Sequence, residues 1–504
     1  MLFGEISDLF SSPDQGKSGW AEIILKICQL LITEGVLYMD LDFRKLAEKY
    51  RNEYFKDLND LVEIESVRDD SLADPELGMP FGPGPRKALD TFLALADRDG
   101  FKTENVDGYA GVVRYGQGDE SVGILGHLDV VPLGDGWSKD PLQVTFEDGY
   151  VFGRGVLDDK GPTLAAYYAL KMIRDENLPL KRKIMLIAGT DEESGSGCMK
   201  YYKKHGEIPT LGFTPDANFP VIYGEKGNMH VSLHSKDKTV IRSFDGGLRP
   251  NIVIGQAEAV IDNSDEKSDL FDFYLKTNGL KGSMSKEEDG IHILMEGIPA
   301  HGSTPYDGLN AGTHLLNFIG EAYDDQLAKD YYEILKDWKG APLGIEKNGV
   351  YMSFLTMNPG IIKFDNDEAY ALVDIRYPND TDPEKVMKGF EKTCQALKSD
   401  INPVLDMAGD PLFVDPDSEL VSSLMNSYRK YTGDTFTPAI TIGGGTYAKE
   451  FDNFVAFGPE KLEEDKTTEA FVGGCHQRDE GIKADDLIEA MAIYADAIYS
   501  LAGE

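Results

Sequence analysis

The chain has 504 residues, more than one hydrophobic core normally supports, so at least two domains are expected. Acidic residues outnumber basic ones by 88 to 50, and the net charge of −38 argues against nucleic acid or an anionic membrane surface as a partner. The four cysteines lie far apart with no CxxC pair, which fits a protein of the reducing cytoplasm.

The first 38 residues have neither the pattern of a membrane anchor nor that of a secretion signal. Charged residues interrupt the apolar stretch at 20–38, which makes it a poor membrane span. Acidic residues precede the first lysine, Lys17, whereas a signal peptide begins with basic residues. A regular helical periodicity starts only at Met39. We therefore expect residues 1–38 to be an extension from a start codon assigned too far upstream. A genuine amphipathic extension is the alternative, and N-terminal sequencing of the native protein would decide.

Between residues 121 and 224 the sequence alternates between strand-like and helix-like stretches. In chain order these are a strand at 121–131, a helix at 162–176, a strand at 182–190, a helix at 196–206, and a strand and turn at 211–224. Pro162 stands in the first turn of its helix, where a missing N–H costs nothing. The alternation predicts a doubly wound α/β domain with a largely parallel sheet.

After about residue 225 the pattern changes to runs of period two, which indicate antiparallel strands with one buried face. These runs are MHVSLHS, QAEAVID, IHILMEG and EAYALVDIRY. The α/β pattern of the first domain returns toward the C-terminus. We therefore predict one α/β domain at 39–225 and 419–504, split by an inserted α+β domain at 226–418.

Acidic residues and histidines gather where the predicted strands end. His127 and Asp129 stand two apart, a spacing that puts both on one face of a strand, and Asp129 can accept the N–H that fixes the tautomer of His127. The other such sites are Asp158–Asp159, Glu192–Glu193, Asp216 and His476. Each alone has an ordinary interpretation as a surface pair, a helix cap, a solvated loop or a turn residue. Together they fall where a doubly wound sheet binds its ligands, at the carboxyl ends of the strands.

Five motifs make the chain similar to a known family. They are GHLDVVP, GRGVLDDKGP, GTDEESG, FTPDANFP and CHQRDE. In this order and at these spacings they resemble the motifs of the co-catalytic dizinc peptidases, which include carboxypeptidase G, aminoacylase, succinyl-diaminopimelate desuccinylase and the carnosinases. The likeness is greatest to the bacterial Xaa-His dipeptidases of the PepV type, and it spans roughly residues 39–504. It implies that the α/β domain is a dimetal catalytic domain and that the insert is its lid.

The resemblance implies a site for two divalent cations. Asp158 would bridge two cations about 3.5 Å apart. The residues alone leave Asp159 open as the bridge, although it is expected to cap the following helix. The remaining ligands that the resemblance implies are His127 and Asp216 for one cation and Glu193 and His476 for the other. Imidazole and carboxylate ligands without thiolate suit Zn²⁺, with Mn²⁺ or Co²⁺ as alternatives.

Glu192 is the general base that the resemblance implies, because two adjacent glutamates cannot both bind one cation with good geometry. It would take a proton from a metal-bridging water and return it to the leaving amine. The reaction would then be amide hydrolysis without a covalent intermediate. Asp129 completes the catalytic set by orienting His127.

The inserted domain is expected to contact the substrate. The stretch EGIPAHGSTPYDGLNAG resembles the family's lid motif, in which His301 would stabilise the tetrahedral oxyanion. Asn251 could hold the same oxygen or the substrate carboxylate, and Arg376 has a guanidinium suited to bidentate carboxylate binding. The glycine-rich turn that could hold the same carboxylate through its N–H groups comprises Gly443, Gly444, Gly445 and Thr446. The simpler alternatives are an interface histidine, a strand salt bridge and a tight turn.

The expected activity is hydrolysis of short unblocked peptides, including Xaa-His or β-alanyl dipeptides. An N-acyl-amino-acid deacylase or a carboxypeptidase of the same family is the alternative, because only the pocket for the substrate's amino end would separate them. A non-catalytic binding protein that keeps the fold is disfavoured, since Glu192 and all five ligands are present.

The length of the insert bears on the oligomeric state. Residues 226–325 and 348–418 each have the pattern of one strand-and-helix unit, whereas shorter relatives carry one such unit and dimerise through it. Two units in one chain can mimic that contact internally. We therefore expect a cytoplasmic monomer in which His301 serves its own active site, with a small peptide as its partner.

Overall fold

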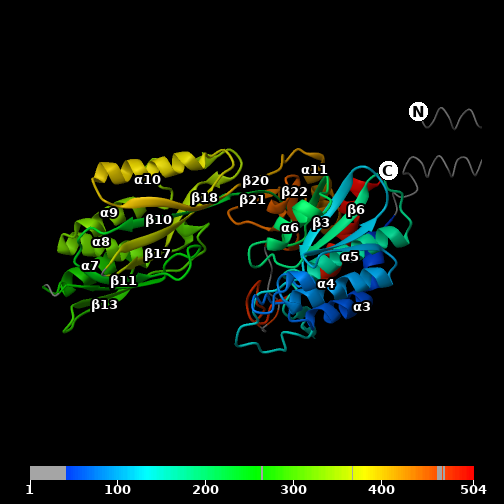
Figure 1. Ribbon diagram of the computed structural model, residues 1–504, viewed down its shortest axis with the longest axis horizontal. Coiled ribbons are helices and arrows are strands. Elements are labelled where there is room, and N and C mark those ends of the chain that lie inside the picture. Colours follow the sequence, from blue (N-terminus) through cyan, green and yellow to red (C-terminus); the bar gives the residue numbers. More distant parts are fainter. Residues whose placement is uncertain (1–40, 263–264, 366, 463–467, 469–470, 504) are drawn as a thin grey trace, which may run out of the picture. The chain divides into compact units, whose positions relative to one another are not determined.

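The computed structural model describes residues 41–503 except for 263–264, 366, 463–467 and 469–470. The expected extension at residues 1–38 lies outside this part of the chain. The chain divides by its internal contacts into two compact units (Figure 1). The first unit runs to Val221 and adds Asp417–Pro438 and the stretch from Ala456 onward, and the second comprises Ile222–Pro416 and Ala439–Val455. The glycine-rich turn therefore belongs to the second unit.

A core of three parallel strands organises the first unit. β3 (Ser121–His127) lies between β6 (Lys183–Gly189) and β7 (Leu211–Thr214) and runs parallel to both. Every residue of β3 is buried, as expected of a strand that is covered on both faces. The sheet continues antiparallel from β6 to β2 (Ala110–Tyr115) and β1 (Lys102–Val106), and β22 (Phe454–Phe457) follows β7.

Helices cover this sheet. α5 (Lys160–Asp175) and α12 (Ala484–Ala502) pack against each other and against β3, and α4 (Pro83–Arg98) packs on β1 and β2. The other elements of the unit are α3 (Phe43–Val62), α6 (Gly197–His205), α11 (Glu419–Thr432), a small sheet of β4 (Thr145–Glu147), β5 (Tyr150–Phe152) and β24 (Gly481–Lys483), and the pair β8 (Ala217–Asn218) and β23 (Pro459–Glu460). The predicted α/β domain with a largely parallel sheet is confirmed.

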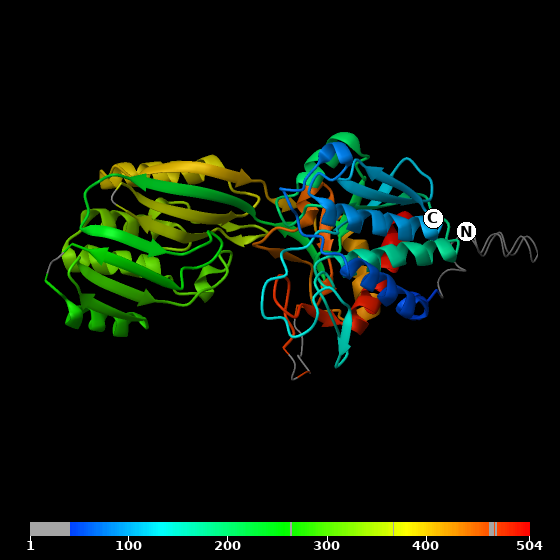
Figure 2. The same ribbon diagram turned by 60° about the horizontal axis from the view of Figure 1, so that its bottom comes forward.

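The second unit is built on one antiparallel sheet of eight strands. Their order is β13 (Lys281–Lys286), β14 (Ile291–Glu296), β12 (Gln256–Ile261), β11 (Ile241–Gly246), β17 (Thr356–Phe364), β18 (Ala369–Tyr377), β10 (Gly227–Ser235) and β19 (Asn402–Gly409). Burial alternates along β12 because helices cover one face of the sheet (Figure 2). Those helices are α7 (Ser268–Asn278), α8 (Ala311–Tyr323), α9 (Gln326–Leu335) and α10 (Pro383–Leu397). The predicted α+β insert is confirmed.

The two halves of the insert share this sheet. β11 comes from the first half and pairs with β17 from the second, with Phe244 opposite Phe364. β10, also from the first half, lies between β18 and β19 of the second half. One continuous apolar core therefore underlies both halves. Five short strands are β9 (Val221–Glu225), β15 (Asn348–Gly349), β16 (Ser353–Phe354), β20 (Leu412–Phe413) and β21 (Ile440–Ile442).

Candidate metal centre

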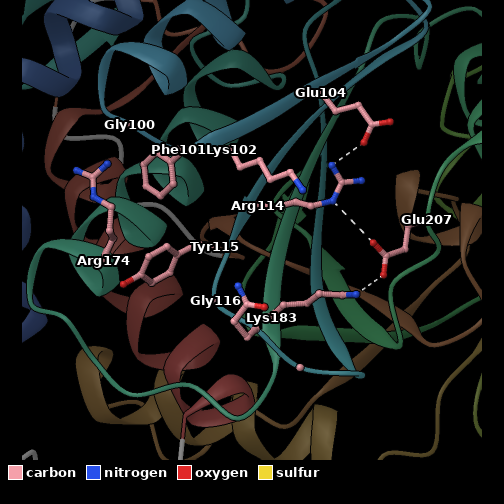
Figure 3. A pocket seen from close by; sticks show the side chains of 12 residues that line it. Gly100, Phe101, Lys102, Glu104, Arg114, Tyr115, Gly116, Arg174, Lys183 and Glu207 are labelled. Atoms are coloured by element: carbon pink, nitrogen blue, oxygen red, sulfur yellow. Dashed lines mark ion pairs between the residues drawn. The ribbon is translucent and has the colours of Figure 1, made fainter.

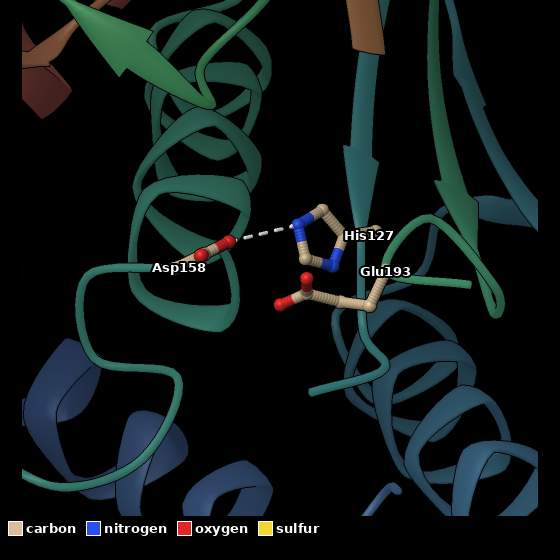
Figure 4. Close-up of side chains that lie close together, drawn as sticks. All are labelled: His127, Asp158 and Glu193. Carbon is tan, nitrogen blue, oxygen red and sulfur yellow. Dashed lines mark hydrogen bonds and ion pairs between the residues drawn. The ribbon is translucent and has the colours of Figure 1, made fainter. Parts of the chain in front are cut away.

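Three strand and loop ends of the first unit bring metal-ligating side chains together. His127 is the last residue of β3, Asp158 lies two residues before the start of α5, and Glu193 lies in the loop after β6. Each offers one ligand atom, and these atoms all lie within 4.8 Å of one another. Figure 4 shows the carboxylates of Asp158 and Glu193 lying beside the imidazole of His127. The arrangement follows from the sheet, because parallel strands end at the same edge.

The carboxylate of Asp158 lies between two imidazoles. Its Oδ1 is 3.1 Å from His127 Nε2, and its Oδ2 is 3.0 Å from His476 Nε2. Each imidazole also meets a second carboxylate: His476 Nε2 is 3.0 Å from Glu193 Oε2, and His127 Nε2 is 3.8 Å from Asp216 Oδ2. The two oxygens of one carboxylate thus face two separate groups of ligand atoms. This donor set fits a pair of divalent cations with a shared carboxylate.

Asp129 holds both His127 and the glutamate loop in place. Its carbonyl oxygen lies 3.0 Å from His127 Nδ1, and because a carbonyl only accepts, this ring nitrogen carries the proton and Nε2 is left as the ligand atom. Its carboxylate oxygens accept the backbone N–H groups of Glu192 at 3.0 Å and Glu193 at 3.1 Å. The expected orienting group was the Asp129 carboxylate, but its Oδ1 lies 3.5 Å from His127 Nδ1. The carbonyl oxygen of Asp129 makes the shorter contact.

Asp159 does not cap α5 with its side chain, so that expectation is wrong. Its Oδ2 instead accepts the backbone N–H of His127 at 3.1 Å and the hydroxyl of Thr163 at 2.7 Å. The side chain is fully buried, and burial raises its pKa to about 7. Asp159 therefore ties the start of α5 to the end of β3, and Asp158 is the residue that faces both imidazoles.

The electrostatics of the site favour added positive charge. Burial raises the pKa of Glu192 to about 7 and holds the pKa of Asp216 well above its usual range. Hydrogen bonds with Asp158 and Glu193 raise the pKa of His476 to about 10. The raised pKa values also reflect the negative charge that several carboxylates bring to the two imidazoles. Divalent cations would neutralise the same charge. The groups are Asp158, Glu192, Glu193, Asp216, His127 and His476.

The residues expected to contact the substrate lie together in the second unit. His301 Nδ1 is 2.7 Å from Ser303 Oγ, and a Cβ placed on Gly443 would lie 2.7 Å from the Ser303 side chain. The carbonyl of Asn251 accepts the N–H of Gly302 at 2.7 Å. The glycine-rich turn, His301 and Asn251 are therefore neighbours.

Arg376 forms the strand salt bridge that was the simpler alternative for it. Its guanidinium binds both carboxylate oxygens of the fully buried Asp374, with Nε at 3.0 and 3.1 Å. Its positive charge also reaches His301: burial, assisted by Arg376, lowers the pKa of that histidine. Arg376 thus adds positive charge beside His301 while Asp374 fixes its position.

Two lysines of the same region, Lys226 and Lys449, are candidate substrate-binding residues that the sequence patterns did not indicate. Lys449 Nζ donates to the carbonyl of Lys226 at 2.7 Å, and Lys226 Nζ donates to the carbonyl of Phe354. Burial, with a smaller contribution from Arg376, lowers the pKa of both lysines. Glu225 binds the N–H of Thr446 at 3.0 Å. The signal available was a Glu-Lys pair at the end of β9, which alone does not separate a binding site from a solvated turn.

Comparison with known proteins agrees with the geometry. The family model described as Peptidase family M20/M25/M40 matches residues 123–500. The chain belongs to this family. It is 38% identical over 470 residues to "Putative dipeptidase YtjP" of Bacillus subtilis, which covers 90% of this chain and 98% of that protein. It is 39% identical over 479 residues to "Putative dipeptidase SH1171" of Staphylococcus haemolyticus, covering 92% of this chain and all of that protein.

Solved structures with the same fold include two dipeptidases. Human carnosine dipeptidase 1 superposes with a TM-score of 0.52 at 17% identity, over 91% of this chain and 98% of that one. The dipeptidase Dug1p of Saccharomyces cerevisiae superposes with a TM-score of 0.53 at 14% identity, over 92% and 99%. The prediction of a peptidase of this family is thereby confirmed. None of the helices in the described ranges has the length and apolar character needed to cross a membrane.

A cavity of about 790 Å³ lies elsewhere in the first unit of this family member, beside β1 and β2 (Figure 3). Its cationic side chains are largely paired: Arg114 meets Glu104 at 2.6 Å, and both Arg114 and Lys183 meet Glu207. None of the residues expected at the active site lines it. This cavity is therefore separate from the strand ends around Asp158.

Proposed function

We propose that the chain is a metal-dependent dipeptidase that hydrolyses short unblocked peptides, including Xaa-His or β-alanyl dipeptides. The observation that carries the proposal is the Asp158 carboxylate, whose two oxygens lie 3.1 Å from His127 and 3.0 Å from His476. Relatives at 38–39% identity that bear dipeptidase names span nearly the whole chain and support the substrate class.

His127 and Asp216 are proposed to hold one cation, and Glu193 and His476 the other, with Asp158 shared. Two such cations would polarise the scissile carbonyl and lower the pKa of a water held between them. Zn²⁺ suits this ligand set best, with Mn²⁺ and Co²⁺ as alternatives. Asp129 supports the ligands of both cations, since its carbonyl orients His127 and its carboxylate anchors the loop that carries Glu193.

Glu192 is proposed as the general base. Its backbone N–H is fixed by Asp129, and burial raises its pKa to about 7, a value suited to taking and releasing a proton near neutral pH. It would take a proton from the attacking water and pass it to the leaving amine. The presence of this group disfavours a non-catalytic binding protein.

The second unit is proposed to bind the substrate through His301 at the oxyanion and through Asn251, Arg376 and the turn Gly443, Gly444, Gly445 and Thr446 at the carboxylate. Lys226 and Lys449 lie in the same region, joined by the hydrogen bond from Lys449 to the carbonyl of Lys226, and with Arg376 they are proposed to bind the free carboxylate of a short peptide.

A substrate panel tests this assignment against the family's other activities. Carnosine, Ala-His and Leu-Gly should be cleaved, whereas acetyl-Met and a tripeptide should be cleaved slowly or not at all. A preference for acetyl-Met would favour the alternative N-acyl-amino-acid deacylase, and release of single residues from the tripeptide's carboxyl end would favour a carboxypeptidase. Metal analysis of the same preparation should give about two divalent ions per chain.

The protein is further proposed to be a monomer. The continuous sheet that joins β11 to β17 supports this, since each half of the insert supplies the neighbour that a partner chain would otherwise supply. Mixing two inactive variants, His301→Ala and Glu192→Ala, should leave the mixture inactive at every concentration. Recovered activity would show that His301 crosses between chains, and a sedimenting mass of twice 55.6 kDa would contradict the monomer.

A further inference from the structure

His476 lies at the tip of a loop that closes on itself. In this loop, residues 473–480 and here named the His476 loop, Gly473 N–H donates to Asp479 O at 2.8 Å and Gly481 N–H donates to Gly473 O at 3.1 Å. The side chain of His476 is 56% exposed, and its backbone has a φ of 65°, a region that non-glycine residues seldom occupy. An exposed ligand on such a loop needs an anchor that fixes its position relative to the other ligands.

Glu480 provides that anchor at the base of the loop. Its side chain is fully buried, and its Oε1 accepts three backbone N–H groups, from Gly155 at 2.9 Å, Leu157 at 3.0 Å and Asp158 at 3.2 Å. Its Oε2 binds Arg154 Nη1 at 2.5 Å. One carboxylate therefore joins the His476 loop to the segment that ends in Asp158, across more than 300 residues of sequence.

Arg154 makes this anchor rigid. Its side chain is only 2% exposed, and its guanidinium lies over the ring of Trp137, 5.1 Å from the centroid. A buried ion pair costs desolvation free energy, so its presence at one loop contact is not explained by stability alone. The carbonyl of Glu480 also accepts the N–H of Gly153 at 3.1 Å, so backbone and side chain hold the same segment.

Asp159 performs the corresponding task on the opposite side of Asp158. Its Oδ2 accepts the backbone N–H of His127 at 3.1 Å and the hydroxyl of Thr163 at 2.7 Å, and neither partner belongs to the His476 loop. Besides its direct contacts with both imidazoles, Asp158 is therefore flanked by two buried carboxylates: Asp159 binds the N–H of His127, and Glu480 binds the N–H of Asp158 itself.

We propose that Glu480 is a positioning residue that holds Asp158 and His476 in register for the cation they share with Glu193, without binding the cation itself. This inference rests on the proposed metal centre and adds a residue to it. Partners that orient metal ligands typically contribute ~10–100-fold to metal affinity. Binding of the cation held by His127 and Asp216 should change less, because Asp159 still binds the N–H of His127, although Asp158 is common to both cations.

The test is a titration of metal-free protein with Zn²⁺ in competition with a chromophoric chelator. Glu480→Gln keeps the side-chain volume, but it places an amide NH₂ against a row of N–H donors or against Arg154. We expect one of the two Zn²⁺ affinities to fall ~10–100-fold and the other to fall less, because Asp158 is shared but His127 keeps its own contact with Asp159. Glu193→Ala removes a ligand of the affected cation and should abolish the same binding event, which identifies it.

Asp57→Asn is the matched control. Asp57 is also fully buried and bound to an arginine, with Arg98 Nη1 at 2.9 Å and Nη2 at 2.8 Å, and it belongs to the same unit. The same acid-to-amide change there should lower the melting temperature and leave both Zn²⁺ affinities unchanged. If Glu480→Gln fails to fold, Arg154→Met tests the same anchor and should lower the affinity for the same cation.

Four results would overturn the inference. Wild-type affinities for both cations in Glu480→Gln would show that the loop needs no anchor. An equal loss of affinity for both cations would show that the effect is general destabilisation. The same loss of affinity in Asp57→Asn would show this too. A wild-type protein that fails to bind two Zn²⁺ ions would remove the proposed metal centre, and this inference with it.

Discussion

Substitution of Glu192 by alanine should lower kcat by ~10²–10⁴-fold and leave two metal ions bound to each chain. The ligand atoms that meet in the first unit belong to His127, Asp158 and Glu193, and Glu192 is not among them. Burial nevertheless raises the pKa of Glu192 to about 7, which is the range that a proton carrier needs. Steady-state kinetics and metal analysis of one preparation measure both effects.

Glu193→Ala should show the opposite pattern in metal content. Glu193 Oε2 lies 3.0 Å from His476 Nε2, so its loss removes a ligand from the cation on that side. The number of bound ions should fall toward one per chain. Glu192→Gln serves as the conservative control, since it keeps the volume and hydrogen bonding of Glu192 but takes up no proton. Loss of metal in Glu192→Ala with retention in Glu193→Ala would mean that the two roles are interchanged.

Much of the candidate site could be predicted because it follows from strand order. His127 ends β3, and Glu193 and Asp216 lie in the loops that follow β6 and β7. Parallel strands present their carboxyl ends at one edge. The apolar runs that identify such strands are local in sequence. The choice of Asp158 over Asp159 came only from the family resemblance, since two adjacent carboxylates before a helix have the same local pattern.

Other parts of the site could not be predicted, because they depend on contacts between distant segments. Asp159 has the sequence position of a helix cap, yet it binds the N–H of His127, 32 residues earlier. The contact of Glu480 with Asp158 spans 322 residues. Nothing in the local pattern of CHQRDE separates a carboxylate that orders a loop from one that is solvated. The single sheet formed by both halves of the insert was likewise hidden, since strand pairing between β11 and β17 leaves no local signal.

Exhaustive chelation should abolish activity, and Zn²⁺ or Mn²⁺ should restore it. The proposed ligands include two imidazoles that must be neutral to bind a cation, and protonation competes with the metal. Activity should therefore fall below about pH 6, near the range in which an unperturbed histidine titrates. Full activity after chelation and dialysis would contradict the metal centre.

Chelation should also change how stability depends on pH. In the metal-free protein, hydrogen bonds with Asp158 and Glu193 raise the pKa of His476 to about 10, against 6.5 for an unperturbed histidine. The folded state then binds a proton that the unfolded chain lacks between these values. The contribution of this proton to the free energy of unfolding is complete below about pH 6.5 and is lost as the pH rises through about 10. Burial raises the pKa of Glu192 from 4.5 to about 7, which gives the same sign over a lower range.

Cations replace these protons when they bind, so they release protons and stabilise the protein more strongly as the pH rises. The melting temperature of the metal-free protein should thus fall between about pH 6 and about pH 9, whereas that of the Zn²⁺-loaded protein should hold or rise. His476→Gln removes the titrating imidazole and should flatten the fall in the metal-free protein. Because the net charge is −38, repulsion alone could also lower stability at high pH. An equally steep fall in His476→Gln would show that the imidazole of His476 is not its cause and would assign the effect to that repulsion or to the other groups of the site.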